Sequence, residues 1–521
     1  MTAASVRERD ARWTRALLLV SAAALLRLVF AAIIPVFPDE TYYWDWSRHI
    51  AAGYFDHPPI VALLTLIGGR LLAPFGASAS FIGVRLGTIV IGWIAAMATI
   101  ATARRLAGNG AALRAALIIT VLPLAAAGLI LTTPDAPVLA ATALGLYCLV
   151  RVLEQPAGSA ESLRWWIITG VVLGAAFASK YTSIFLPVAV VLAILIRADL
   201  RPRLRESGPY VACVVATLVF APVLVWNAHH GWISFAFQLR HGLSAPKGSA
   251  LLAAWKHEGD FFGGQAGLAS PILFIMLAIA TIGALSRRSR DGIAAARFML
   301  AMVAALTFVF FIYSAIRQRV EPNWPAPAYI PAIVLLATAP LGERAKKWLV
   351  GGLWFAAAMS ALIYVQAIVP VLPLKPAKDP IARAFGWRDV TVAADREAQA
   401  ATDATHHPTW LGGDRYQEAS VLAFYTPTHP ATFATNLGGR PNQYDLWPGF
   451  RNRAQAGDNL VLVLDDSQTP PSPIVALAPY FAMVQPAEVV TLRRGSGEIG
   501  TRRIWRLTGW RGGWPQQPAA Y

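Results

Sequence analysis

Residues 14–59 read TRALLLVSAAALLRLVFAAIIPVFPDETYYWDWSRHIAAGYFDHPP, and this stretch decides the fold. It opens with an apolar run, 14–35, that is long enough to cross a bilayer as a helix. Asp39 and Glu40 follow directly after that run. Adjacent carboxylates are costly to place at the mouth of a membrane segment, so they are more often functional than incidental. The stretch therefore predicts a membrane protein with a polar site just outside its first span.

The composition supports a membrane protein over its whole length. The 521 residues are 56% hydrophobic and only 14% charged, with a mean hydropathy of +0.49, whereas soluble domains carry about 25% charged residues. A soluble enzyme is therefore excluded. The net charge of +16 comes from cations in short loops between apolar runs, where they set orientation, so we predict no nucleic-acid partner. Both cysteines lie in apolar runs and offer no metal cluster.

Apolar segments long enough to span a bilayer recur along the chain. With roughly 20 residues per span, about eleven candidates follow. They are 14–35, 80–103, 112–131, 134–151, 164–179, 181–197, 208–226, 267–286, 294–315, 323–340 and 347–370. Aromatic residues and the Pro58-Pro59 pair break the further apolar piece 58–75, so we expect helices that lie in the membrane interface there. The predicted class is an all-α polytopic membrane protein.

The loops alternate in charge, which predicts an orientation. Under this segmentation the arginine- and lysine-rich loops all fall on one side, which we expect to be cytoplasmic together with the N-terminus. The other side receives the first loop and everything after Val371. Residues 371–521 are polar and contain strand-like NLVLVLDD, EVVTLRR and TRRIWRLTGW and helix-like GGDRYQEASVLAFYTP. We therefore predict two domains, a transmembrane domain at 1–370 and a small α/β domain at 371–521.

Polar residues expected on the outer side carry the candidate chemistry, and each has a structural alternative. Asp39 and Glu40 could cap the helix that starts near them, and Asp135 could cap the helix that follows it. Lys180 interrupts an apolar stretch, where it needs an anion such as a lipid phosphate, or else extends to the interface. His57 is held extended by the following proline and could bind phosphate or orient a carboxylate. Their occurrence together favours function.

Two kinds of protein fit these residues. Carboxylates for base chemistry, cations for a phosphate and access to lipid together indicate group transfer from a lipid-phosphate donor. The alternative is a secondary transporter or lipid flippase, with Asp39, Asp135 and Lys180 as an ion relay. No GxxxxGK[ST] or HExxH motif is present in the sequence. We predict catalysis without a cofactor or metal, with a divalent cation on Asp39, Glu40 and His57 as the alternative.

Several segments resemble one known superfamily. PDETYYWDWSRHIAAGYFDHPPIVALL, TTPDAP, SKYTSIFLP, EPNWPAPAYIP and GGDRYQEASVLAFYTP are similar, in the same order, to the GT-C membrane glycosyltransferases that include protein O-mannosyltransferases and lipid A aminoarabinose transferases (glycosyltransferase families 39 and 83). The pattern is most similar to the bacterial branch with galacturonic acid transferases acting on lipopolysaccharide. The resemblance implies a GT-C fold in the bacterial inner membrane and a periplasmic active site.

The same resemblance implies a polyprenyl (undecaprenyl) phosphate sugar as donor, a lipid or glycan acceptor such as lipid A or lipopolysaccharide core, and inversion at the anomeric carbon. Asp39 matches the catalytic carboxylate of the first outer loop. His57 stands where the aminoarabinose transferases have lysine, and Tyr42-Tyr43 stands where they have Arg-Tyr. The sugar, the acceptor and the oligomeric state stay open. The candidate residues are Asp39, Glu40 and Asp135 for catalysis, and Tyr42, Tyr43, Asp56, His57, Lys180, Tyr181, Arg240, His241, Glu321 and Asn323 for binding substrate or donor phosphate.

Overall fold

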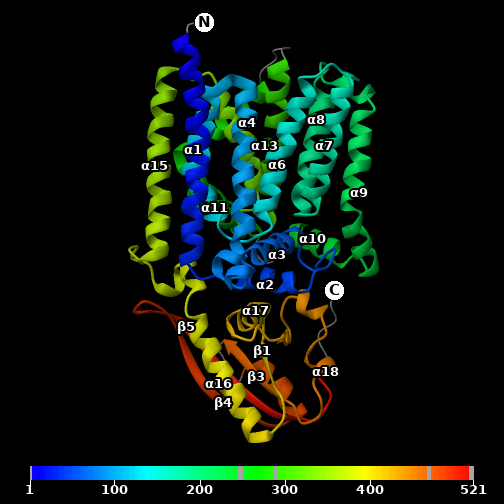
Figure 1. Ribbon diagram of the computed structural model, residues 1–521, viewed down its shortest axis with the longest axis vertical. Coiled ribbons are helices and arrows are strands. Elements are labelled where there is room, and N and C mark those ends of the chain that lie inside the picture. The colour runs from blue at the N-terminus through cyan, green and yellow to red at the C-terminus, as the bar shows by residue number, and fades with distance from the viewer. Residues whose placement is uncertain (1–2, 244–249, 287–291, 466–470, 516–521) are drawn as a thin grey trace. The chain divides into compact units, whose positions relative to one another are not determined.

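The computed structural model describes residues 3–243, 250–286, 292–465 and 471–515 (Figure 1). They form two compact units, each with its own core. The helical unit comprises Met1–Ala31, Ala51–Leu64 and Arg85–Val365, and the α/β unit comprises Ala32–Ile50, Thr65–Val84 and Gln366–Tyr521. The predicted division into domains 1–370 and 371–521 stays a prediction, and the α/β unit additionally takes in residues 32–50 and 65–84.

Helices follow the predicted apolar runs. Their bounds are α1 Ala3–Ile33, α3 Ile60–Leu72, α4 Phe81–Val121, α5 Pro123–Gly128, α6 Asp135–Leu153, α7 Ala160–Phe177, α8 Phe185–Ile196, α9 Gly208–His229, α10 Ile233–Leu243, α11 Ala250–Ala269, α12 Pro271–Ser286, α13 Gly292–Arg317, α14 Tyr329–Thr338 and α15 Glu343–Ile368. The predicted span 80–103 falls on the first part of α4, and the predicted span 112–131 covers the last part of α4 together with α5. The helix α4 is broken at Ala107 and Gly108, where Gly108 has a left-handed φ of 75° that glycine adopts without strain.

Six of the described helices are long and apolar enough to cross a membrane, namely α1, α4, α6, α9, α13 and α15. A seventh span results if α11 and α12, bent by 99° at their junction, are counted as one. Shorter apolar helices cover 60–75, 181–196 and 326–338. The predicted class, a helical multi-pass membrane protein with a small C-terminal sheet, is confirmed, while the number of about eleven spans stays a prediction.

Small residues bring the helices of the helical unit close together. Its core cluster is rich in buried alanines, which let helix backbones approach each other in membranes. The contact between α7 and α9 shows the tightest case. A Cβ atom added at Gly170 or Gly174 would lie 2.6 Å from the carbonyl oxygen of Ala212 or from Cβ of Val219, respectively. Larger side chains at these two glycines would therefore push the helices apart.

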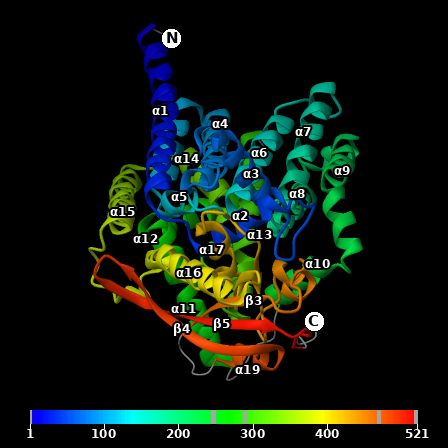
Figure 2. The ribbon, with the colours of Figure 1, turned by 60° about the horizontal axis from the view of Figure 1, so that its bottom comes forward.

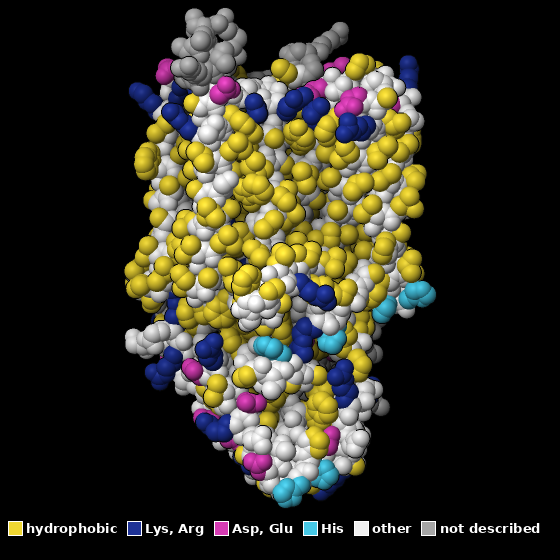
Figure 3. All heavy atoms as spheres, in the orientation of Figure 1, with side chains coloured by type: hydrophobic (Ala, Val, Ile, Leu, Met, Phe, Trp, Pro, Cys, Tyr) yellow, Lys and Arg dark blue, Asp and Glu magenta, His cyan; other side chains and the backbone are white. Residues whose placement is uncertain are grey.

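Lys and Arg side chains gather at one end of the helical unit, and hydrophobic side chains cover its flank (Figure 3). Arg105, just before the break in α4, donates from Nε to Oε1 of Glu154 at 2.9 Å, directly after α6 ends. Arg203, between α8 and α9, donates to the backbone oxygen of Gln155 at 2.6 Å. These contacts tie three chain segments together at the C-terminal end of α6. Asp135 begins α6 and therefore lies at the opposite end.

A mixed five-stranded sheet forms the centre of the α/β unit (Figure 2). The strand order is β2-β1-β3-β5-β4, with β1 parallel to both neighbours and β5 antiparallel to both of its own. The bounds are β1 Thr409–Gly413, β2 Thr432–Ala434, β3 Asn459–Asp465, β4 Phe481–Arg494 and β5 Gly497–Trp510, with helices α2 Pro38–Arg48, α16 Trp387–Thr405, α17 Tyr416–Tyr425, α18 Phe450–Arg453 and α19 Ser472–Leu477. The three strands predicted from NLVLVLDD, EVVTLRR and TRRIWRLTGW are confirmed as β3, β4 and β5.

Alternation along β3 builds a core on both faces of the sheet. Val461 and Val463 pack with residues of α16, whereas Leu460 and Leu462 belong to a second cluster with α18 and α19. The segment predicted as helical, GGDRYQEASVLAFYTP, is only partly so. Its two glycines end β1, and the helix α17 begins at Tyr416. The prediction of a helix was wrong at the two glycines, because they form the end of β1. Only glycine fits at position 413, since a Cβ there would lie 2.4 Å from Cβ of Glu418.

Candidate functional site

Asp135, Lys180 and Asn323 form a buried polar cluster in the helical unit. Asp135 is the first residue of α6, Lys180 follows the end of α7, and Asn323 lies in the turn before Ala326–Ala328. Lys180 Nζ lies 2.5 Å from Asp135 Oδ1, and Asn323 Nδ2 donates to Asp135 Oδ2 at 2.6 Å. Asp135 and Lys180 are each 8% exposed. Three predicted candidates, up to 188 positions apart in the chain, are thus brought together.

The cluster explains how the membrane unit tolerates Lys180. Its ammonium group is paired with the carboxylate of Asp135 inside the helical unit, in line with its need for an anion, and the alternative of extension to the interface stays a prediction. Among the described residues, one of the three N–H groups of the Lys180 ammonium donates to Asp135. Asp135 is the first residue of α6, where a negative charge is favourable, but the N-cap is Pro134 and no side-chain cap hydrogen bond is made, so the capping alternative is wrong. The remaining donors of Lys180 can bind a second anion.

The loop with Asp56 and His57 is held by α10. Gln238 Nε2 donates to the backbone oxygen of Asp56 at 2.7 Å, and Ser234 Oγ donates to that of Tyr54 at 2.6 Å. Asp56 is buried, and His57 is half-buried. Close packing fixes the loop further, because a Cβ on Gly53 would lie 2.7 Å from the ring of Trp226. The loop is therefore well anchored.

The other candidates of the helical unit have separate surroundings. Tyr181 accepts a hydrogen bond from Asn227 Nδ2 at 3.3 Å and packs against Phe235. Glu321 is exposed and forms an ion pair with Arg319 at 3.5 Å. It therefore does not share the ion pair of Asp135 and Lys180. The predicted pair Arg240 and His241 falls in the last turn of α10, where the side chains lie outside the described residues.

In the α/β unit, the neighbours Asp39 and Glu40 have different surroundings. Both lie in the first turn of α2, after Pro38, which is pre-shaped for a helix start. Glu40 is 1% exposed and accepts the backbone N–H of Phe37 at 2.9 Å, so it closes the start of the helix. Asp39 is half-buried and accepts the hydroxyl of Tyr416 at 2.9 Å. Asp39 is therefore the member of the pair that is open to a substrate.

A cluster of packed aromatic rings, called the stack below although the rings are tilted or edge-on, positions Tyr416. Its ring lies 4.3 Å from that of Tyr42, which also packs on Tyr43 and Trp46. The hydroxyl of Tyr42 accepts the backbone N–H of Gln443 at 2.6 Å. Tyr42 and Tyr43, predicted to bind substrate, are buried in this stack. Their described contacts support the helix that carries Asp39.

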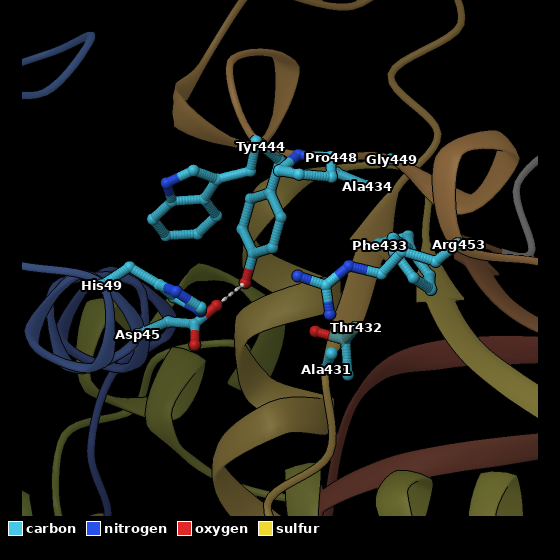
Figure 4. A pocket seen from close by; sticks show the side chains of 11 residues that line it. Asp45, His49, Ala431, Thr432, Phe433, Ala434, Tyr444, Pro448, Gly449 and Arg453 are labelled. Carbon is cyan, nitrogen blue, oxygen red and sulfur yellow. Dashed lines mark hydrogen bonds between the residues drawn. The ribbon is translucent and has the colours of Figure 1, made fainter.

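Sequence reasoning missed a second polar group on α2 (Figure 4). Tyr444 Oη donates to Asp45 Oδ2 at 2.6 Å, and Arg48 Nη1 donates to Oδ1 at 3.0 Å. Asp45 and Tyr444 line a cavity of about 60 Å³ together with His49 and Arg453. Burial raises the pKa of Asp45 and, together with that carboxylate, holds the pKa of Tyr444 well above its ordinary value. Asp45 lies in the segment 14–59 quoted at the start, but its partner Tyr444 lies 399 positions further along the chain, so no local sequence pattern connects the two.

Among the described residues, no group of three or more His, Cys, Asp or Glu side chains is placed to hold a metal ion. Glu40 turns toward the backbone of Phe37, and Asp39 accepts from Tyr416. The alternative of a divalent cation on Asp39, Glu40 and His57 and the expectation of metal-independent catalysis both stay predictions.

Comparisons with known proteins agree with the sequence resemblance. Residues 56–226 match the family described as dolichyl-phosphate-mannose-protein mannosyltransferase. Over 369 residues the chain is 26% identical to the lipid A galacturonosyltransferase RgtD of Rhizobium johnstonii, covering 70% of this chain and 74% of that protein. The crystal structure of ArnT from Cupriavidus metallidurans bound to undecaprenyl phosphate matches with a TM-score of 0.60 at 18% identity, over 96% of this chain and 99% of ArnT. This last match shows the GT-C fold.

Proposed function

We propose that this chain is a GT-C membrane glycosyltransferase of the branch that includes lipid A transferases, and that it uses a polyprenyl-phosphate sugar; the family match over residues 56–226, the similarity to RgtD and the fold of ArnT support this. The reaction transfers a sugar from an undecaprenyl-phosphate donor to lipid A, lipopolysaccharide core or another envelope glycan. It takes place on the periplasmic side of a bacterial inner membrane. The names of RgtD, a lipid A transferase, and of ArnT, bound to undecaprenyl phosphate, support the acceptor and the donor.

The half-open carboxylate of Asp39 carries the proposal. It is held by a neutral donor, the Tyr416 hydroxyl, and no lysine or arginine among the described residues pairs with it. Its half-buried position leaves it accessible to an attacking hydroxyl group. Its place in the first turn of α2 fixes its direction. These are the properties that a general base needs.

The chemistry is a single displacement. An acceptor oxygen attacks the anomeric carbon while the bond from that carbon to the phosphate oxygen breaks, and polyprenyl phosphate leaves with the bonding electrons. The configuration at the anomeric carbon is inverted. If the acceptor is a hydroxyl group, Asp39 takes its proton; if the acceptor is a phosphate, Asp39 orients it. Glu40, whose described contact is with the helix start, supports the position of Asp39.

Lys180 stabilises the negative charge on the leaving phosphate. Asp135 and Asn323 fix the direction of its ammonium group, and its unused N–H donors bind phosphate oxygens. Asp56, His57, Tyr181 and the loop cations Arg240 and His241 are proposed to complete donor binding. Glu321, exposed beside Arg319, contributes at most at the edge of the site.

The topology is part of the proposal. The arginine-rich end of the helical unit, where α6 finishes, faces the cytoplasm, in line with the rule that cations stay on that side. The beginning of α6 with Asp135 then faces the periplasm. Residues 371–521 form the periplasmic domain.

The test compares envelope glycans in cells that carry the wild-type protein, Asp39→Asn or Asp403→Asn at equal membrane abundance. Asp403 is an exposed residue of α16 and serves as the matched control. Mass spectrometry should show loss of one sugar mass from one glycan in Asp39→Asn alone. With purified protein and donor, the rate should fall about 10²–10⁴-fold, as expected for loss of a general base. An unchanged glycan profile in Asp39→Asn would favour the transporter or flippase instead.

A further inference from the structure

An apolar groove opens at the surface of the helical unit, between α12, the end of α14 and the first two turns of α13 and α15. Its volume is about 530 Å³, within the range of ligand sites. Every residue that lines it belongs to the helical unit. The groove can therefore be described within that unit alone.

The groove lies at the arginine-rich end of the helical unit, away from Asp135. Asn323, which donates to Asp135, precedes α14, whereas the groove is formed where α14 ends. At this end of α14, Arg114 Nε donates to the backbone oxygen of Ala337 at 2.7 Å. The hydrogen bond ties α14 to the part of α4 that follows its break near Arg105. The sugar and the phosphate of the proposed transfer therefore do not account for the groove.

Lipid is the surrounding that this groove meets, because α13 and α15 are long and apolar enough to cross a membrane. Three of its hydrophobic side chains, Ile275, Ile279 and Trp348, are 57%, 64% and 55% exposed. Along α12 the groove extends from Ile272 to Gly283, which is about 16 Å at 1.5 Å per residue. That length is about half of the roughly 30 Å hydrocarbon core of a bilayer. The groove therefore fits an acyl chain of one leaflet.

Positive groups stand beside the apolar wall. Arg297 lines the groove, is 9% exposed, and donates from Nη1 to the backbone oxygen of Thr338 at 2.9 Å, which fixes its guanidinium group in the wall. Arg344 and Lys347 are exposed on α15, and neither has an ion pair within the described part of the chain. Arg344 shares a helix face with Trp348, four positions later. Basic pockets between membrane helices bind anionic lipid head groups.

We propose that this groove binds an anionic glycerophospholipid. One acyl chain lies along α12, and the phosphate group lies beside Arg297, Arg344 and Lys347. The lipid belongs to the leaflet at the arginine-rich end, which is the cytoplasmic leaflet under the proposed topology. It contacts four helices, α12 to α15, and so stabilises their packing. The inference goes beyond the proposed function and does not depend on sugar transfer.

A binding test with charge variants uses the purified full-length protein in detergent. Native mass spectrometry measures the dissociation constants of phosphatidylglycerol and of net-neutral phosphatidylethanolamine, and we expect phosphatidylglycerol to bind about tenfold more tightly. Arg344→Gln/Lys347→Gln should weaken phosphatidylglycerol binding about 10–30-fold. The matched control, Arg15→Gln/Arg205→Gln, removes two exposed arginines that do not line the groove, so it should leave the dissociation constant unchanged.

A second variant fills the groove instead of changing its charge. A Cβ on Gly283, which lines the groove, would meet no atom within 4 Å. Gly283→Leu therefore occupies the space of the lipid without displacing protein atoms, and it should weaken phosphatidylglycerol binding about tenfold. Gly351→Leu is the matched control, because Gly351 on α15 is also open to a Cβ but does not line the groove. It should bind the lipid as the wild type does.

Three results would overturn the lipid site. One is equal binding of phosphatidylglycerol and phosphatidylethanolamine, and another is an equal loss of binding in a variant and its control. The third is tighter binding of undecaprenyl phosphate than of phosphatidylglycerol, abolished by Gly283→Leu, which would assign the groove to a polyprenyl chain. None of these measurements uses sugar transfer, so the lipid site and the proposed function can fail separately.

Discussion

Removing the charge of Lys180 should destabilise the helical unit strongly, although only one side chain is changed. The ammonium group and Asp135 lie 2.5 Å apart with side chains 10% and 11% exposed. At an effective dielectric constant of about 20, their attraction is about 7 kcal/mol, which is offset by a desolvation cost of several kcal/mol for each ion. The intact pair therefore contributes little net stability, but Lys180→Met leaves Asp135 charged and buried. We expect a loss of about 3–5 kcal/mol.

The assay measures the free energy of unfolding of the purified protein in detergent. A double-mutant cycle compares the wild type, the single variants Asp135→Asn and Lys180→Met, and the double variant. Asp135→Asn/Lys180→Met removes both charges, so it should be more stable than the two single variants predict, with a coupling energy of about 2–3 kcal/mol. The control is Lys346→Met, because Lys346 pairs with Glu343 at 2.6 Å on the exposed surface. Such a surface pair is worth at most about 1 kcal/mol.

Two results would contradict this reasoning. One is a Lys180→Met variant that unfolds within about 1 kcal/mol of the wild type, which would mean that Asp135 is solvated or neutral. The other is strict additivity in the cycle. If the double variant folds well and still transfers no sugar, the loss belongs to phosphate binding and not to the fold. If it transfers sugar normally, the proposed role of Lys180 is wrong.

The remaining predictions concern α2. Tyr416→Phe keeps the ring on Tyr42 but removes the hydroxyl that holds Asp39, so kcat should fall about tenfold while Tyr480→Phe, a tyrosine outside this stack, leaves it unchanged. Burial raises the folded-state pKa of Asp45, so its ionised form is disfavoured in the fold. Relative to Asp45→Asn, wild-type stability should therefore fall as pH rises above the ordinary value of 3.8; parallel pH profiles would refute this.

The arrangement of helices was largely predictable because apolar runs and helices coincide. The differences have local causes. The helix α8 has only 12 residues and is preceded by Tyr181–Ile184, a tighter helical turn, so an apolar run of bilayer length is not one continuous α-helix. The break in α4 at Ala107 and Gly108, by contrast, falls between the predicted spans 80–103 and 112–131, where Arg104, Arg105 and Asn109 interrupt the apolar sequence. Hydrophobicity indicates where a helix forms and not how far it stays regular.

The candidate residues were found more easily than their partners. Asp135 and Lys180 lie 45 positions apart and were both singled out, since charged residues in apolar surroundings are conspicuous. Tyr416 and Tyr444 were not, although each donates a hydrogen bond to an aspartate of α2 from 377 and 399 positions away. A tyrosine in a polar segment has no pattern that separates a partner from a surface residue. Only the fold brings α17 and the segment around Tyr444 onto α2.

The order of the two neighbouring carboxylates follows from the geometry of the helix start. Glu40 is the third residue of α2, and a glutamate at that place is long enough to reach back to the N–H of Phe37. Asp39, one position earlier, is shorter and instead stays at the half-open side, where Tyr416 meets it. Interchanging the two would place the shorter side chain at the cap and the longer, more mobile one at the proposed reaction site. In the proposed reaction the pair therefore combines a structural carboxylate, Glu40, with a chemical one, Asp39, and the first stabilises the direction of the second.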